Sequence, residues 1–162
     1  MELKPIKRSE HIILLSKDHH ASLLFCWKIR QAMKMDVDME RIKKYVQYFW
    51  QHHMQPHFKE EEEILFAPLK DKKVEKAIEE HGQIKTQIDT LLNSSEMEAD
   101  TSLKLADMVD KHVRYEEREL FPYLETALTA EQLEAIGKQL QLVKPAILKD
   151  AFEDEFWIHK QN

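Results

Sequence analysis

Glycine, proline and cysteine are scarce in this chain. Its 162 residues include two glycines, five prolines and one cysteine, Cys26. Tight turns usually need glycine or proline, so this composition excludes a many-stranded antiparallel fold, a glycine-rich nucleotide-binding loop and a collagen-like chain. A single cysteine excludes an internal disulfide bond. Long helices with brief connections remain, and the sequence therefore predicts an all-α protein.

The chain also lacks a long apolar run and an excess of positive charge. No stretch approaches the roughly 18 apolar residues of a membrane-spanning helix, and the first ten residues lack the apolar segment of a secretory signal. The 24 Lys and Arg against 30 Asp and Glu give a formal net charge of -6, which repels nucleic acid and anionic membrane surfaces. We therefore expect a cytoplasmic protein that has no nucleic acid and no membrane as a partner.

Hydrophobic residues recur with the period of an amphipathic helix along four segments. The predicted helices span residues 9–33, 39–65, 74–92 and 101–124. Pro56 interrupts the second helix, and because proline removes the hydrogen bond to the carbonyl of His52, we expect a kink just before His57. Four helices of this length with short connections fold most simply as an up-down-up-down four-helix bundle.

A C-terminal helical extension follows the bundle. Thr129 and Gln132 form a capping-box pattern, which predicts a further helix towards Gln141. Phe152 and Phe156 in the remaining tail predict packing across the bundle or against a second subunit, so a homodimer or another protein partner stays open. We expect residues 1–128 to form the bundle and residues 129–162 to form an extension packed on the same domain.

Six ionisable residues lie on helix stripes that are otherwise apolar. They are His19, His57, Glu61, His81, His112 and Glu116. Buried ionisable groups are normally paired or bound to a metal. His57 and Glu61 are four residues apart, which places them about 6 Å apart on one helix face, within reach of the same ion. His112 and Glu116 repeat this spacing.

The sequence around these residues is repeated. Residues 57–66, His-Phe-Lys-Glu-Glu-Glu-Glu-Ile-Leu-Phe, align without gaps on residues 112–121, His-Val-Arg-Tyr-Glu-Glu-Arg-Glu-Leu-Phe. Each half also opens with a helix that bears one inward histidine, His19 or His81. Two such hairpins can be related by a pseudo-twofold axis that brings four imidazoles and two carboxylates together. We infer a dinuclear site in which each metal ion takes two imidazoles and in which Glu61 and Glu116 bridge the two ions.

The donor atoms narrow the choice of metal. Imidazole and carboxylate ligands without a thiolate suit iron, manganese or zinc. We expect two non-haem iron ions, because a carboxylate-bridged iron pair with an open position can pass electrons to oxygen species and zinc cannot. Zinc and manganese are the alternatives.

Two further histidines are weaker candidates for ligands. His20 adjoins His19 but points about 100° away from it around the helix. His53 lies one turn before His57 on the same face, where it is either a ligand or a hydrogen-bonding partner of a ligand. Cys26 is expected to be a small buried residue of the core.

The glutamates beside the motifs leave alternatives open. Glu117 competes with Glu116 for the bridging role, and the internal repeat favours Glu116. Glu60, Glu62 and Glu63 are expected on a solvated helix face, although Glu60 could reach an ion by leaning inward.

The histidines and the doubled His-x-x-x-Glu motif resemble those of the hemerythrin-like (HHE cation-binding) family from about Ser9 to Leu124. The resemblance implies a non-haem di-iron centre with the four histidines as terminal ligands and Glu61 and Glu116 as bridges. Oxygen carriers of the family have another histidine one turn before the one that matches His81, where this chain has Ala77. The ligand set is closest to the repair-of-iron-centres branch, whose cysteine-containing N-terminal segment is not seen here.

Three functional hypotheses follow from the resemblance and the ligand chemistry. In the first, the di-iron centre binds or senses oxygen, nitric oxide or peroxide. In the second, it is a di-iron oxidoreductase or an iron-centre repair protein in oxidative or nitrosative stress. In the third, the bundle is a zinc-bound or metal-free interaction scaffold. Enzymatic activity is left open.

Overall fold

A computed structural model describes residues 7–94, 99–144 and 149–158, and the regular structure in these ranges is entirely helical. The helices are α1 (Ile13–Lys34), α2 (Met39–Phe49), α3 (Gln55–Glu60), α4 (Lys72–Asn93), α5 (Ala99–Tyr115), α6 (Phe121–Ala127) and α7 (Ala130–Val143). Three wider π turns, with i→i+5 hydrogen bonds, connect some of them: η1 (Trp50–Met54), η2 (Glu61–Leu65) and η3 (Glu116–Leu120). The prediction of an all-α protein is confirmed.

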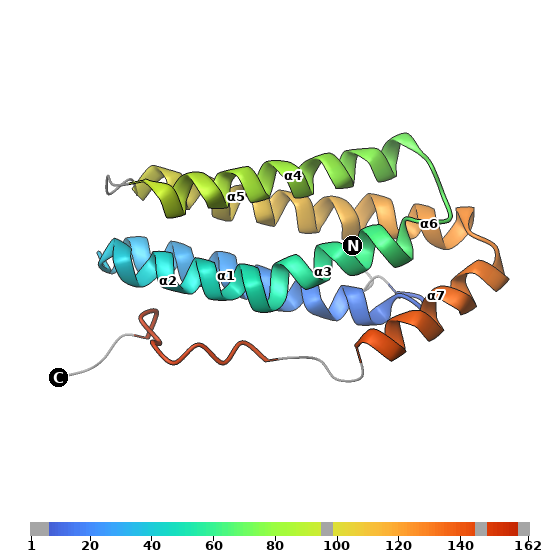
Figure 1. Ribbon diagram of the computed structural model, residues 1–162, viewed down its shortest axis with the longest axis horizontal. Coiled ribbons are helices and arrows are strands. Elements are labelled where there is room, and N and C mark those ends of the chain that lie inside the picture. The colour runs from blue at the N-terminus through green and yellow to red at the C-terminus, as the bar shows by residue number, and fades with distance from the viewer. Residues whose placement is uncertain (1–6, 95–98, 145–148, 159–162) are drawn as a thin grey trace, which may run out of the picture.

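The helices make four long rods that lie side by side (Figure 1). The first rod is α1, the second runs from α2 through η2, the third is α4, and the fourth runs from α5 through α6. Because α1 packs against α2 and α5, and α4 packs against the same two helices, every rod contacts two neighbours. This is the predicted up-down-up-down four-helix bundle.

The second rod stays helical through Pro56, as predicted, and an irregular turn precedes the proline. Pro56 stands at the start of α3, and the turn that accommodates it is η1, where the N–H of Gln55 donates to the carbonyl of Trp50. A proline leaves the carbonyl of His52 without its partner and its ring crowds that carbonyl, and a wider π turn relieves the crowding. The π turn over Trp50–Met54 therefore lies directly before the helix that contains Pro56 and His57.

Two apolar layers fill the bundle, and a polar layer separates them. One apolar layer includes Phe25, Ile29, Phe49, Ile84 and Val109, and the other includes Leu15, Leu65, Ala77 and Leu120. On α1, His19 lies between Leu15 and Phe25, and the other three rods place their inward histidines and glutamates at the same level. A buried Leu, Ile or Phe contributes about 1.5–3 kcal/mol, so the two apolar layers offset the cost of burying the polar one.

The C-terminal extension packs on the bundle. Helix α7 begins at the predicted capping box, in which Gln132 N–H donates to Thr129 Oγ1 (3.1 Å) and Thr129 N–H donates to Gln132 Oε1 (3.0 Å). Its apolar face joins the layer that contains Leu120. Residues 149–158 then run back beside α1 and α2 without forming a helix (Figure 1). Phe156 is buried against Tyr45 there, with ring centroids 5.5 Å apart, so the tail packs across the bundle.

In the part of the chain that the structure describes, no helix combines the length and the apolar character needed to cross a bilayer.

Candidate metal centre

The six ionisable residues singled out in the sequence meet at the middle of the bundle. His19 comes from α1, His81 from α4 and His112 from α5. His57 lies in α3, and Glu61 and Glu116 are the first residues of η2 and η3. Each of the six residues is at most 4% exposed. Two of the three π turns thus begin at the glutamates, in line with the frequent occurrence of such turns at functional sites.

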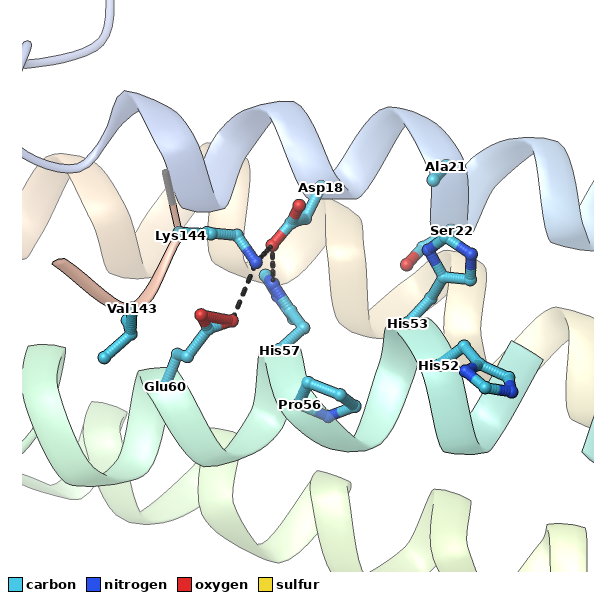
Figure 2. A pocket seen from close by; sticks show the side chains of 10 residues that line it. All are labelled: Asp18, Ala21, Ser22, His52, His53, Pro56, His57, Glu60, Val143 and Lys144. Atoms are coloured by element: carbon cyan, nitrogen blue, oxygen red, sulfur yellow. Dashed lines mark hydrogen bonds and ion pairs between the residues drawn. The ribbon is translucent and has the colours of Figure 1, made fainter. Parts of the chain in front are cut away.

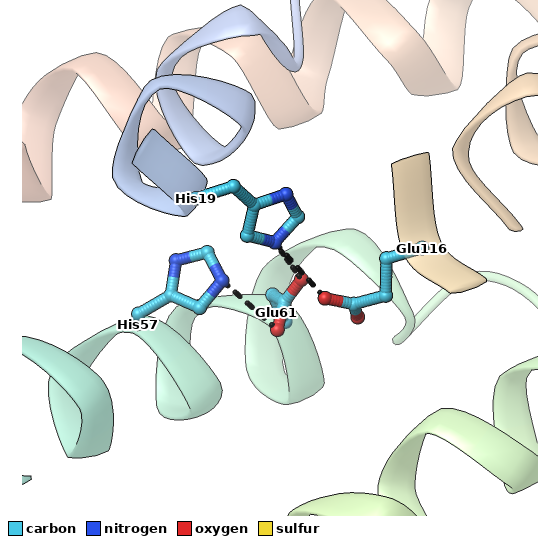
Figure 3. A group of neighbouring side chains, drawn as sticks. All are labelled: His19, His57, Glu61 and Glu116. Atoms are coloured by element: carbon cyan, nitrogen blue, oxygen red, sulfur yellow. Dashed lines mark hydrogen bonds and ion pairs between the residues drawn. The ribbon is translucent and has the colours of Figure 1, made fainter. Parts of the chain in front are cut away.

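The first group of potential ligands joins His19, His57, Glu61 and Glu116 (Figure 3). The Nε2 atom of His19 lies 3.0 Å from Glu116 Oε1 and 3.9 Å from Glu61 Oε2. The Nε2 atom of His57 lies 3.2 Å from Glu61 Oε1. One ligand atom from each of the four residues falls within 4.8 Å of the others, which is close enough for all four to coordinate one ion.

The second group joins His81 and His112 to the same two glutamates. The Nε2 atom of His81 lies 3.1 Å from Glu61 Oε1, and that of His112 lies 3.2 Å from Glu116 Oε1. Because Glu61 and Glu116 belong to both groups, each of two neighbouring ions would have two imidazoles of its own and would share the two carboxylates. These six residues are the ones that the internal repeat was expected to bring together.

Several buried polar atoms of the centre lack hydrogen-bond partners among the described residues. Among the described residues, the Nε2 atoms of His57, His81 and His112 accept or donate no hydrogen bond, and the same holds for both carboxylate oxygens of Glu61 and for Oε2 of Glu116. Native proteins leave few buried polar atoms unpaired, because each costs about 1–3 kcal/mol. Six such atoms that converge on one place fit a pair of cations, which would satisfy all of them.

A second set of carboxylates orients the four imidazoles. Each Nδ1 lies beside a carboxylate oxygen: His19 with Glu117 (2.8 Å), His57 with Asp18 (2.9 Å), His81 with Glu62 (2.9 Å) and His112 with Glu80 (2.8 Å). An ionised carboxylate accepts a hydrogen bond from the Nδ1–H group, which fixes the tautomer that leaves Nε2 free to bind a metal. All four imidazoles are thus oriented with Nε2 towards the centre.

This second set obeys the same pseudo-twofold symmetry as the ligands. Asp18 directly precedes His19 in the sequence and forms a hydrogen bond with His57 of the same half. In the other half, Glu80 directly precedes His81 and forms a hydrogen bond with His112. The glutamates that follow Glu61 and Glu116 each contact a histidine of the other half. Glu117 forms a hydrogen bond with His19, and Glu62 forms one with His81. The symmetry therefore relates all ten residues, namely the six potential ligands and the four supporting carboxylates.

Protons balance the charge of the cluster in the absence of metal. Burial opposes the charged form of His112, but the negative charge of Glu116, whose Oε1 lies 3.2 Å from Nε2, and the hydrogen bond to Glu80 outweigh it and raise the pKa of His112 to about 10. Neighbouring carboxylates likewise overcome burial and raise the pKa values of His19, His57 and His81. Conversely, although burial alone would raise the pKa of Glu116, His112 and His19 hold it well below its usual value. Metal ions that bind here must therefore displace protons.

The structure separates the alternative histidines from the centre. His20 is exposed on the outer face of α1. His53 stacks on Phe49 at a ring-centroid distance of 5.0 Å, and burial lowers its pKa. Neither His20 nor His53 belongs to the two groups of potential ligands found among the described residues.

The alternative glutamates also lie outside the centre. Glu117 backs His19 and does not compete with Glu116. Glu62 was expected on a solvated face, and although it is partly exposed, it accepts from His81. Glu60 accepts a hydrogen bond from Lys144 (2.7 Å). Sequence reasoning missed the supporting role of Asp18, Glu62, Glu80 and Glu117, and the only available signal was that each adjoins a predicted ligand in the chain.

The fold and this cluster define a four-helix-bundle protein with a buried, twofold-related set of four imidazoles and two shared carboxylates, suited to a pair of cations. The sequence profile of the Hemerythrin HHE cation binding domain matches residues 11–124. The match covers more than half of the chain, and the chain therefore belongs to this family of metal-binding proteins. Searches of curated proteins and of solved structures gave no significant match.

Proposed function

We propose that this protein holds two non-haem iron ions between Glu61 and Glu116 and binds or senses a small oxidant or diatomic ligand, namely oxygen, nitric oxide or peroxide. The observation that carries the proposal is the pair of ligand groups that share both glutamates. Two ions that share carboxylates are close enough to act as one centre. When bound, an iron pair supplies one-electron and two-electron chemistry towards such ligands, which zinc does not.

Three features of the chain support this proposal: the hydrogen bonds that orient the imidazoles, the apolar layers on both sides of the centre, and the alanine at position 77. The four Nδ1–carboxylate hydrogen bonds fix the imidazoles before any metal binds, which lowers the cost of organising the site. The apolar layers on both sides of the centre restrict access to small ligands. The buried Ala77, one turn before His81, supplies no ligand atom, so each group of potential ligands offers two imidazoles, and the ion held by His81 and His112 would have a position left for an exogenous ligand.

The first test is the metal content and optical spectrum of anaerobically purified protein. The proposal predicts two iron ions per chain and a new charge-transfer band in the near-ultraviolet to visible range when oxygen or azide is admitted. Zinc as the only metal, or a well-folded protein that binds no metal, would contradict the proposal and favour the interaction scaffold.

A turnover experiment separates sensing from catalysis. With peroxide or nitric oxide and an excess of reductant, a sensor is expected to react once per centre, whereas an oxidoreductase consumes many equivalents. We propose the sensor, in which occupancy of the centre is transmitted through the extension that packs on α1 and α2, and sustained turnover would contradict that choice.

A further inference from the structure

Two cations from outside the matched domain reach the carboxylates that orient the metal ligands. Arg8 precedes residues 11–124 and Lys144 follows them. The side chain of Arg8 is only 4% exposed. Its Nη2 donates to Oε2 of Glu117 (2.8 Å), whose other oxygen lies 2.8 Å from Nδ1 of His19. Arg8 also pairs with Glu125 and donates to Ser16 (3.2 Å), so its guanidinium is fixed in place.

Lys144 makes the corresponding contact behind His57. It lies at the end of α7 and borders a cavity of about 210 Å³ between α1 and α3 (Figure 2). Its Nζ atom lies 2.6 Å from Oδ2 of Asp18 and 2.7 Å from Oε1 of Glu60, and the same Oδ2 accepts from Nδ1 of His57 (2.9 Å). The Lys144 side chain is 13% exposed, so this contact is largely shielded from water.

In the described ranges, no buried Lys or Arg contacts the carboxylates that support His81 and His112. Glu80, which backs His112, pairs with Lys76 (2.6 Å), but the side chain of Lys76 is 53% exposed. Glu62, which backs His81, pairs with no cation within the described ranges. Exposed ion pairs contribute about 0–1 kcal/mol, so the supports of His81 and His112 are held less firmly than those of His19 and His57.

We propose that Arg8 and Lys144 are positioning residues that make the two metal positions unequal, so that the His19–His57 position releases its ion more slowly than the His81–His112 position. For an ion to leave, an imidazole must turn away from it, and this turn requires its supporting carboxylate to move. Arg8 and Lys144 hold the carboxylates of Glu117 and Asp18 in place, and among the described residues no buried Lys or Arg does the same for Glu62 and Glu80. The inference rests on the metal-binding part of the proposed function, but it requires neither iron nor oxygen chemistry.

The test measures metal release with Zn²⁺, a metal without redox chemistry. The full chain is loaded with two equivalents of Zn²⁺, and an excess of a chromogenic chelator then reports release over time. We expect two phases of about one equivalent each in the unmodified protein. Lys144→Met is expected to accelerate the slow phase by about 10-fold, the lower end of the effect of losing an outer-shell partner, and to leave the fast phase unchanged.

Matched variants distinguish positioning from general loss of structure. Lys76→Met removes the exposed counterpart in the other half and is expected to change either phase by less than about 2-fold, in line with the weakness of exposed pairs. Lys144→Arg restores the charge and should restore the slow phase, and Arg8→Gln should accelerate that phase independently of Lys144. Far-UV circular dichroism of each variant checks that the helices are intact.

Release of both ions in a single phase by the unmodified protein would overturn the inference. Equal acceleration of both phases by Lys144→Met would also overturn it. Failure to bind two Zn²⁺ would contradict the two-position site itself, whereas two Zn²⁺ bound without any affinity for iron would contradict only the proposed function.

Discussion

The stability of the metal-free protein is expected to fall as the pH rises from 6.5 to 9.5. Neighbouring carboxylates raise the pKa of His112 from 6.5 to about 10 in the folded protein despite its burial. A pKa that is higher in the folded state than in the unfolded state means that the folded protein binds the proton more tightly. The resulting stabilisation is complete below pH 6.5 and is lost as the pH rises through about 10. The pKa values of His19, His57 and His81 are raised too, so their contributions have the same sign.

The magnitude follows from the size of the pKa change at His112. At about 1.4 kcal/mol per pKa unit, the full contribution of this residue is about 5 kcal/mol as an upper limit. Between pH 6.5 and 9.5, linkage predicts a loss of about 3–4 kcal/mol from His112 alone. Metal ions bind neutral imidazoles, so the Zn²⁺-loaded protein gains affinity for its metal over the same range. The difference in the free energy of unfolding between the Zn²⁺-loaded and the metal-free protein therefore increases as the pH rises.

The assay is urea-induced unfolding followed by far-UV circular dichroism at pH 6.5, 8 and 9.5. It compares chelator-treated protein, Zn²⁺-loaded protein and a metal-free His112→Gln variant. The variant lacks the titrating group and is expected to lose stability less steeply with pH than the metal-free parent. A metal-free protein that keeps or gains stability up to pH 9.5, or a variant that declines in parallel with its parent, would refute the reasoning.

Three further predictions concern single residues, and the first two use a neighbouring residue as a control. His19→Ala is expected to lower the metal content measured by elemental analysis, whereas His20→Ala at the adjacent exposed position is not. Glu61→Gln should impair both metal positions because Glu61 belongs to both ligand groups, whereas Glu62→Gln should weaken chelator-measured affinity by only about 10–100-fold. Cys26 is buried, and burial raises its pKa to about 12, so a thiol reagent at pH 8 should label it only after denaturation; rapid labelling of the folded protein would contradict its burial.

The helices and their assembly into a bundle could be predicted because the buried apolar residues recur in the sequence with the period of a helix. The apolar period fixed the four rods, and the capping box at Thr129 marked the start of α7. The π turns η2 and η3 were not predicted, because the predicted helices follow the α-helical period of 3.6 residues along their whole length. Pro56 did indicate an interruption of the helix. Because a proline crowds the carbonyl of the preceding turn, the irregular hydrogen bonding lies in that turn, over Trp50–Met54.

The inward ligands could be predicted because they break an apolar stripe. Their supporting carboxylates could not, since acidic residues on a helix usually face solvent and their presence there needs no special explanation. Glu62 and Glu117 follow the bridging glutamates directly and therefore point about 100° away from them. Only the packing of neighbouring helices shows that this direction leads to His81 and His19.

The residues around the ligands bear on function because they can give the two metal positions different properties even though both positions have the same types of ligand. Each of the two groups of potential ligands offers two imidazoles and the same two glutamates, so the ligand set alone would make two bound ions equivalent. Arg8 and Lys144 fall outside the repeat and pair with the carboxylates behind only one of the positions. A pair of ions with unequal rates of release can therefore arise without any change of ligand. Because Lys144 ends the helix of the C-terminal extension, any displacement of that extension would act first on His57.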